Sequence, residues 1–240
     1  MTLFVVHMHK ASISISKPIL NENDIHAEKL RAQFKKNNTL VLNVVSSPGS
    51  GKTELVTVLA KHLIQNGKKV AVIVGDLATD NDAVRIRSSG AETYQINTNG
   101  TCHLDARMIQ KALAHLDWIK ADILIIENVG NLVCPASYDL GEALRIVLLS
   151  VTEGEDKPAK YPSMFHSSQL CVITKMDLAE ACEFNLKRAK DFILDVAPHI
   201  TIVETSAKRD EGIIKVMNYV NDHIKNHDDE AKRIISAQKE

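Results

Sequence analysis

Short apolar runs alternate with segments of helical periodicity along most of the chain. Runs rich in Val, Ile and Leu, bounded by turn-forming or charged residues, predict buried strands at residues 41–45, 70–74, 93–96, 123–126, 144–151, 170–173 and 200–203. Helical patterns lie between them, at residues 24–36, 52–65, 83–88, 104–119, 185–196 and 212–223. Strands that alternate with helices predict an α/β fold, in which a mostly parallel sheet is covered by helices on both faces.

The two ends of the chain depart from this alternation. Residues 1–20 alternate only weakly, and they predict either an edge strand or a loose arm. Asn23 or Asp24 is expected to cap the first helix, with Ile25, Leu30 and Phe34 as its apolar contacts. We therefore divide the chain into an N-terminal arm and helix (1–37), a central domain (38–225) and a charged tail (226–240).

A glycine-rich loop follows the first strand, with the sequence Ser-Ser-Pro-Gly-Ser-Gly-Lys-Thr at residues 46–53. Strand, loop and helix in this order are typical of a phosphate-binding loop, in which successive backbone N–H groups point at one anion. A glycine-rich turn alone would explain the glycines, but not Lys-Thr at this spacing. Ser46 stands where the usual pattern has glycine. The predicted nucleotide contacts in this loop are Gly49, Ser50, Gly51, Lys52, Thr53 and Glu54.

Carboxylates follow the buried strands at the edge where a parallel sheet binds its ligands. Glu127 opens Glu-Asn-Val-Gly at 127–130, which resembles the Asp-x-x-Gly second switch of GTPases with Glu in place of Asp, unless it is only a turn residue. Asp76 ends another strand, while Asp80 and Asp82 either join it or cap the next helix. Mg²⁺ prefers oxygen ligands. We assign Mg²⁺ to Thr53, Asp76 and Glu127, catalysis to Lys52, Asp76 and Glu127, and a γ-phosphate contact to Gly130.

Two later loops predict recognition of guanine. Thr-Lys-Met-Asp at 174–177 follows one strand, and Ser-Ala-Lys at 206–208 follows the next. A carboxylate at Asp177 accepts hydrogen bonds from the N1–H and the exocyclic amine of guanine, a donor pair that adenine lacks. The stem of Lys175 can cover the base. Lys-x-Asp alone is a weak signal, but its order in the chain favours GTP as the nucleotide, with Lys175, Asp177, Ser206, Ala207 and Lys208 around the base.

Cys102, His103 and Cys134 border the position expected for the γ-phosphate. Thiolate and imidazole ligands suit Zn²⁺ or Ni²⁺. One chain supplies only three ligands, and a symmetric dimer would supply six. The alternative is that the cysteines are small buried thiols. Of the other two cysteines, Cys171 is expected in the core and Cys182 has no predicted partner.

Composition and charge limit the kinds of partner and the location that are expected for the chain. The chain has 240 residues and a formal net charge of −1, so no strong field draws it to nucleic acid or to an anionic membrane. No apolar run reaches the ~20 residues of a membrane-spanning helix. Four widely spaced cysteines without Cys-x-x-Cys suggest free thiols and a cytoplasmic location.

Several strings together resemble the HypB family of hydrogenase/urease nickel-incorporation GTPases. They are the loop at 46–53, Gly-Asp-Leu-Ala-Thr-Asp-Asn-Asp-Ala at 75–83, Cys-His-Leu-Asp-Ala at 102–106, Ile-Glu-Asn-Val-Gly-Asn-Leu-Val-Cys-Pro at 126–135, and Glu-Gly-Glu-Asp-Lys-Pro with Lys-Tyr-Pro at 153–162. The resemblance implies a P-loop NTPase fold of the SIMIBI type, with 38–225 as the GTPase domain. It implies a GTP-hydrolysing metallochaperone for [NiFe] hydrogenase, GTP-dependent homodimers, and a Ni²⁺ or Zn²⁺ site at Cys102, His103 and Cys134. Other maturation proteins and the hydrogenase large subunit are the implied partners.

Two features depart from the family pattern. The N-terminus carries only His7 and His9 where relatives have cysteine-rich or histidine-rich nickel motifs, so bulk nickel storage is not expected. Thr174 replaces the usual Asn of the base loop.

Asn131, not Gln, follows Gly130, and no arginine finger is identifiable, so slow intrinsic hydrolysis is expected. The rival hypotheses are a urease-type nickel-insertion GTPase, whose expected Cys-Pro-His motif is absent, and a non-catalytic metal-binding protein that uses GTP as a structural ligand.

Overall fold

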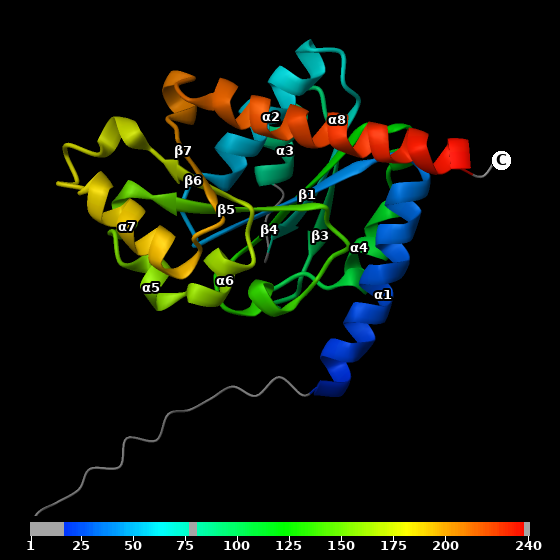
Figure 1. Cartoon of the computed structure of the whole chain (residues 1–240), viewed down its shortest axis with the longest axis horizontal. Coiled ribbons are helices and arrows are strands. Elements are labelled where there is room, and N and C mark those ends of the chain that lie inside the picture. The colour runs from blue at the N-terminus through cyan, green and yellow to red at the C-terminus, as the bar shows by residue number, and fades with distance from the viewer. Residues whose placement is uncertain (1–16, 77–80, 238–240) are drawn as a thin grey trace, which may run out of the picture.

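The computed structural model describes residues 17–76 and 81–237, and it contains one seven-stranded sheet (Figure 1). The strand order is β3-β2-β4-β1-β5-β6-β7, and every neighbouring pair is parallel. The strands are β1 (Leu40–Ser46), β2 (Val70–Asp76), β3 (Glu92–Asn97), β4 (Ile123–Gly130), β5 (Leu144–Ser150), β6 (Leu170–Thr174) and β7 (Thr201–Glu204). The predicted fold class, a mostly parallel sheet with helices on both faces, is confirmed.

Helices cover both faces of the sheet (Figure 1). Because side chains alternate along a strand, Leu40, Leu42 and Val44 face one side while Val41 and Val45 face the other. The first face packs against α2 (Lys52–Gln65), α3 (Asn81–Arg87) and α8 (Ile213–Ala237). The second packs against α1 (Lys17–Lys36), α4 (Ala106–Leu113), α6 (Pro162–His166) and α7 (Leu186–Val196), with α5 (Lys157–Lys160) beside α7.

The first helix begins earlier than the sequence suggests. α1 starts at Lys17, and Pro18 fits its first turn because proline needs no N–H partner there. The predicted cap Asn23 therefore lies inside the helix, where it is buried and bonded to other elements. Ile25 is 57% exposed, so its predicted apolar contact is wrong, whereas Leu30 and Phe34 are buried as predicted. Residues 1–16, to which most of the strand-or-arm prediction applies, lie outside the described residues.

The helix predicted at 104–119 is shorter at both ends. Asp105 caps α4 by accepting a 2.7 Å hydrogen bond from the N–H of Met108, so Leu104 precedes the helix and packs instead against Gly75. After Leu113 the chain turns into a short 3₁₀ segment, Trp118–Lys120. The apolar periodicity of the sequence continues across this turn, so the pattern alone does not show that the helix ends at Leu113. The final helix is longer than predicted, since α8 continues past 223 to Ala237.

The five inner strands of the sheet are β2, β4, β1, β5 and β6. They run parallel, so their C-terminal ends all lie at one edge of the sheet. The ends are Ser46, Asp76, Gly130, Ser150 and Thr174. β4 continues three residues past Glu127, and its pairing with β1 shifts between Val44 and Ser46. The predicted site residues therefore converge on this edge of the sheet.

The backbone turn at Gly212 provides a test of the fold. Gly212 has φ +74°, and a Cβ there would lie 2.0 Å from the carbonyl oxygen of Glu204, whereas Gly67 has φ +80° and open space around it. Gly67→Ala should cost about 1–2 kcal/mol for the left-handed conformation alone. Gly212→Ala should cost clearly more, because strain and collision add. Chemical denaturation measures both, and equal losses would contradict the close approach.

Candidate nucleotide and metal site

The phosphate-binding loop is shaped by two left-handed glycines. Gly49 has φ +74° and Gly51 has φ +91°, immediately before α2 begins at Lys52. The Lys52 ammonium donates a 3.0 Å hydrogen bond to the hydroxyl of Ser46. Ser46, which departs from the usual glycine, thus holds the lysine across the loop. The Ser50 side chain is buried, and its hydroxyl lies 2.5 Å from Glu153 Oε1.

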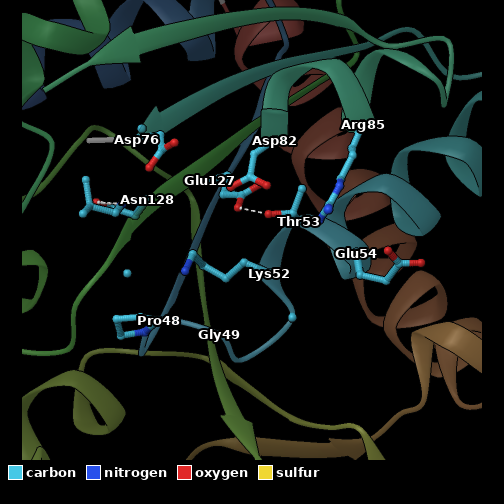
Figure 2. A pocket seen from close by; sticks show the side chains of 14 residues that line it. Pro48, Gly49, Lys52, Thr53, Glu54, Asp76, Asp82, Arg85, Glu127 and Asn128 are labelled. Atoms are coloured by element: carbon cyan, nitrogen blue, oxygen red, sulfur yellow. Dashed lines mark hydrogen bonds between the residues drawn. The ribbon is translucent and has the colours of Figure 1, made fainter. Parts of the chain in front are cut away.

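A cavity of about 430 Å³ opens above this loop (Figure 2). Its walls come from the loop, from the ends of β2 and β4, and from α3. Ten of the residues that line it are Gly49, Gly51, Lys52, Thr53, Glu54, Asp76, Asp82, Arg85, Glu127 and Gly130. The structure therefore brings together every residue predicted to hold phosphate or Mg²⁺ except Ser50, whose side chain points away.

Glu127 is the most perturbed carboxylate at this cavity. It is 3% exposed, Oε1 accepts a 2.7 Å hydrogen bond from the Thr53 hydroxyl, and Oε2 has no hydrogen-bond partner among the described residues. Burial raises the pKa of Glu127 to about 7, although Thr53 and Lys52 oppose the shift. Burial likewise lowers the pKa of Lys52. A buried carboxylate oxygen without a partner, next to a threonine hydroxyl, fits the oxygen ligands that Mg²⁺ requires.

Sequence reasoning leaves one part of this cavity open and misses another. Asp82 and Arg85 both face it from α3, where a spacing of three residues places them on one side of the helix. The sequence alone leaves Asp82 open between a cap and a ligand, and Arg85 belongs to no motif. Asp80, the other open candidate, lies outside the described residues.

A second cavity of about 460 Å³ adjoins the first, since Gly51 and Glu54 line both. It is walled by the predicted base-binding residues Lys175, Asp177, Ala207 and Lys208, together with Leu55, Thr174 and Leu178. Two connected spaces, one above the phosphate loop and one between the two predicted base loops, have the layout that a nucleoside triphosphate requires.

Hydrogen bonds tie the base loops to the phosphate loop. The Thr174 hydroxyl donates to the carbonyl of Ser50 at 2.7 Å, and the Lys175 ammonium donates to the carbonyl of Gly49 at 2.6 Å. Thr174, the departure from the usual Asn, thus provides a donor to the loop. Ser206 donates to Asp177 Oδ1 at 2.6 Å, and this bond lowers the pKa of Asp177. Asp177 is therefore held ionised at the wall of the second cavity.

The three predicted metal ligands also come together. One ligand atom from each of Cys102, His103 and Cys134 lies within 4.8 Å of the others, and the two sulfurs are 3.1 Å apart. Among the described residues no other group of three such side chains is this close. Two thiols and an imidazole at this spacing fit Zn²⁺ or Ni²⁺. Cys171 is buried as predicted, and Cys182 is exposed.

The surroundings of the cluster favour its neutral forms. Burial, and then the neighbouring Cys102, raise the pKa of Cys134, while burial lowers the pKa of His103. The His103 ring stacks on Tyr138 with 3.9 Å between centroids. The Asn131 side chain donates to the carbonyl of Cys102 at 3.1 Å, so the segment after β4 touches the loop before α4. A metal ion bound here would have to displace protons.

One segment connects the two sites. Residues 127–134 run from Glu127, through Gly130, to Cys134. Gly130 is packed so closely on the phosphate loop that a Cβ would lie 3.0 Å from Pro48 Cα. Cys134 follows Gly130 by only four residues in the chain.

Comparisons with known proteins agree with this geometry. The family model for the CobW/HypB/UreG nucleotide-binding domain matches residues 40–204. The hydrogenase maturation factor HypB of Azotobacter vinelandii is 48% identical over 201 residues, which are 84% of this chain and 66% of that protein. The hydrogenase/urease maturation factor HypB of Helicobacter hepaticus is 42% identical over 218 residues, 89% of each chain.

A solved structure also resembles the chain. The crystal structure of HypB from Helicobacter pylori in complex with nickel superposes with a TM-score of 0.80 at 41% identity, covering 85% of this chain and 96% of that one. The predicted family and the P-loop NTPase fold are thereby confirmed. Within the described residues, no helix combines the length and the apolar character needed to cross a membrane.

The raised pKa of Glu127 predicts a pH effect on the protein without nucleotide or Mg²⁺. Between the ordinary carboxyl pKa of 4.5 and about 7 the folded state binds more protons than the unfolded state, so the contribution of Glu127 to stability falls as pH rises through this window. Glu127→Gln should therefore stabilise the protein most above pH 7 and least near pH 5.

Denaturant titrations at pH 5, 6, 7 and 8 measure this difference. Glu54→Gln, at an exposed carboxylate of the same cavity, is the matched control for the exchange of Glu for Gln. A gain from Glu127→Gln that does not depend on pH would contradict the raised pKa.

Proposed function

The chain belongs to the CobW/HypB/UreG family, within its HypB members, and from this premise we propose that it is a GTP-hydrolysing metallochaperone. It couples GTP binding, hydrolysis and dimerisation to the delivery of Ni²⁺ during maturation of [NiFe] hydrogenase. The observation that carries the proposal is the segment 127–134, which begins at a carboxylate of the phosphate cavity and ends at a thiol of the metal cluster.

The chain's own residues suit binding of GTP. Asp177, ionised and oriented by Ser206, accepts the N1–H and the amine of guanine through its two carboxylate oxygens. The Lys175 stem covers the base, because its ammonium is anchored on Gly49. The glycine loop and the N-terminus of α2 bind the phosphates, and Lys52 neutralises their charge.

Hydrolysis needs a divalent cation, which supplies charge neutralisation at the β- and γ-phosphates when bound. Thr53, Asp76 and Glu127 are the residues that would hold it, and their fit rests on the orphaned Oε2 of Glu127. Glu127 must lose its proton for this role. Asn131 takes the place of a water-orienting Gln, which supports a slow intrinsic rate.

The metal cluster argues for assembly of two chains. Cys102, His103 and Cys134 supply three ligands, one fewer than a closed four-coordinate site. They lie at the same sheet edge as the incomplete catalytic site. A homodimer across this edge, formed with GTP bound, completes both, and Ni²⁺ or Zn²⁺ is the bound cargo.

We propose that the cargo passes to the hydrogenase large subunit together with other maturation proteins, in the cytoplasm. The urease-type alternative is disfavoured because Ala136 follows Cys134-Pro135, so no Cys-Pro-His motif is formed. The non-catalytic alternative is tested below.

Base selection gives the first test. Asp177→Asn should weaken GTP binding relative to xanthosine triphosphate, because xanthine presents a carbonyl where guanine has an amine, and Asn can donate to it. Competition binding of the two triphosphates measures the ratio. Glu180→Gln, at an exposed residue three positions on, should leave the ratio unchanged. An unaltered preference in Asp177→Asn would remove this carboxylate from the base site.

The proposed coupling gives the second test. Purified protein should hydrolyse GTP, and Lys52→Ala should abolish turnover; persistent turnover would mean that it arises elsewhere. Ni²⁺ affinity should differ between the GDP and GTP-analogue states by about 1–3 kcal/mol, with the converse effect of metal on GTP affinity.

Cys134→Ala should remove this dependence while GTP binding survives. Light scattering in each state should show a dimer only with the GTP analogue. Absence of turnover with normal GTP binding would favour the non-catalytic alternative. Equal metal affinities in the two states would separate the metal site from the GTPase.

A further inference from the structure

The two segments that carry the metal ligands are both attached to a third element. One segment, residues 102–106, contains Cys102 and His103 and leads into α4. The other, residues 134–141, begins at Cys134. α1 packs across both of them, within the core cluster that also contains Leu104 and Leu140.

A single side chain of α1 bonds to both segments. Asn23 is 6% exposed, its Oδ1 accepts a hydrogen bond from the N–H of Ala106 at 2.9 Å, and its Nδ2 donates to the carbonyl of Asp139 at 2.9 Å. The amide acceptor therefore faces a backbone donor, and the amide donor faces a backbone acceptor. In the middle of a helix, a buried Asn is unfavourable unless its side chain is satisfied in this way.

Ion pairs flank this residue on each side. Glu22 pairs with Arg107 in α4, and Arg31 pairs with Asp139 at 2.5 Å. Arg31 and the N–H of Gly141 lower the pKa of Asp139 against the opposing effect of its burial, so this carboxylate stays ionised. The helix backbone itself lies close to the second segment, since a Cβ at Gly141 would be 2.9 Å from the carbonyl oxygen of Ala27.

We propose that Asn23 is a positioning residue of the metal site, which holds the segment of Cys102 and His103 in register with the segment of Cys134. The proposal rests on the proposed function in so far as the cluster binds metal. Direct contacts between the segments lie at the ligands themselves, where Cys102 Sγ approaches Cys134 Sγ and the His103 ring stacks on Tyr138. Asn131, just before the second segment, also donates to the carbonyl of Cys102. Asn23 acts from behind, through backbone groups three and five residues away from the nearest ligands.

The expected effect of substituting Asn23 on metal affinity follows from its two hydrogen bonds, which together we call the Asn23 clamp. Asn23→Leu fills similar space but leaves the buried N–H of Ala106 and the partly buried carbonyl of Asp139 without their partner. Asn23→Asp keeps an acceptor for Ala106 and loses the donor to Asp139. Residues that orient metal ligands from behind typically contribute 10–100-fold to metal affinity. We expect Asn23→Leu to weaken Ni²⁺ and Zn²⁺ binding by roughly that factor and Asn23→Asp by less.

The experiment has one readout that needs no metal. A bifunctional thiol reagent that fluoresces only when it bridges two thiols reports the approach of Cys102 to Cys134, whose sulfurs are 3.1 Å apart. Bridging should be fast in the wild type, slower in Asn23→Asp and slowest in Asn23→Leu. Cys134→Ala gives the background from Cys171 and Cys182.

The second readout is Ni²⁺ affinity of the full chain by competition with a chromophoric chelator, with binding of a fluorescent GTP analogue as the measure of an intact nucleotide site. Thr39→Val is the matched control. Thr39 is also buried, and its hydroxyl donates to the carbonyl of Ala121 at 3.0 Å, just before the start of β1 and so at the opposite end of that strand from the phosphate loop. It should lower the melting temperature and leave bridging and metal affinity unchanged.

The outcomes separate the two proposals. Wild-type bridging rates and metal affinity in Asn23→Leu, with only a lower melting temperature, would reduce Asn23 to a structural contact and overturn the inference. Slower bridging in the Asn23 variants, without Ni²⁺ or Zn²⁺ binding even by the wild type, would uphold the clamp and overturn the metal function. Equal effects from Thr39→Val would attribute the result to general destabilisation and overturn the inference as well.

Discussion

The pairing of β1 with β4 is the constraint on which the site depends. β1 carries the phosphate loop and β4 carries Glu127, and their parallel register brings both to one edge of the sheet. The shift between Val44 and Ser46 lets β4 continue to Gly130, which meets Pro48 at close range. Because these strands are central and buried, neither end can move far without disturbing the core. The position of Cys134 follows from the same pairing, since it lies only four residues beyond Gly130.

The phosphate cavity has a charge imbalance that its ligands are suited to correct. Asp76, Asp82 and Glu127 converge where Lys52 is the buried cation, and burial disfavours the charged forms of both Lys52 and Glu127. A polyanion alone would be repelled by the carboxylates, and a cation alone would leave Lys52 without a counterion. A nucleotide bound together with a divalent cation satisfies both sets of charges. The site therefore favours the pair over either component, which is the behaviour a nucleotide-dependent switch requires.

The sequence sufficed to place the candidate site residues whose positions depend on backbone shape and on strand ends. The loop around Gly49 and Gly51, the carboxylate of Glu127 and the base loop of Asp177 were predicted because each motif sits where a parallel sheet must end. It did not suffice where a contact joins distant segments. Asn is a typical helix-capping residue, so the sequence predicts a cap at Asn23 or Asp24, and nothing local indicates that α1 crosses two loops. Leu104 fits the apolar periodicity of the helix that follows it, but it lies outside that helix, because Asp105 caps α4 and the helix begins only at Ala106. Arg85 reaches the cavity only because α3 is packed against α2.

The nucleotide and metal sites share one property that links them beyond their common segment. In each, burial favours the neutral form of a ligand group: it raises the pKa of Glu127 to about 7 and raises the pKa of the Cys134 thiol, so both retain protons, and it lowers the pKa of His103, which leaves a neutral imidazole. A divalent cation at Glu127 must displace one proton, and a transition metal at the cysteines must displace those of the thiols. The protons retained on Glu127 and Cys134 thus compete with an ion at each site. Closure over a second chain would change the solvation of both groups at once, because Glu127 and Cys134 lie on the same edge of the sheet. Coupling between the two chemistries then requires no long pathway, only a shared surface whose hydration is altered by assembly.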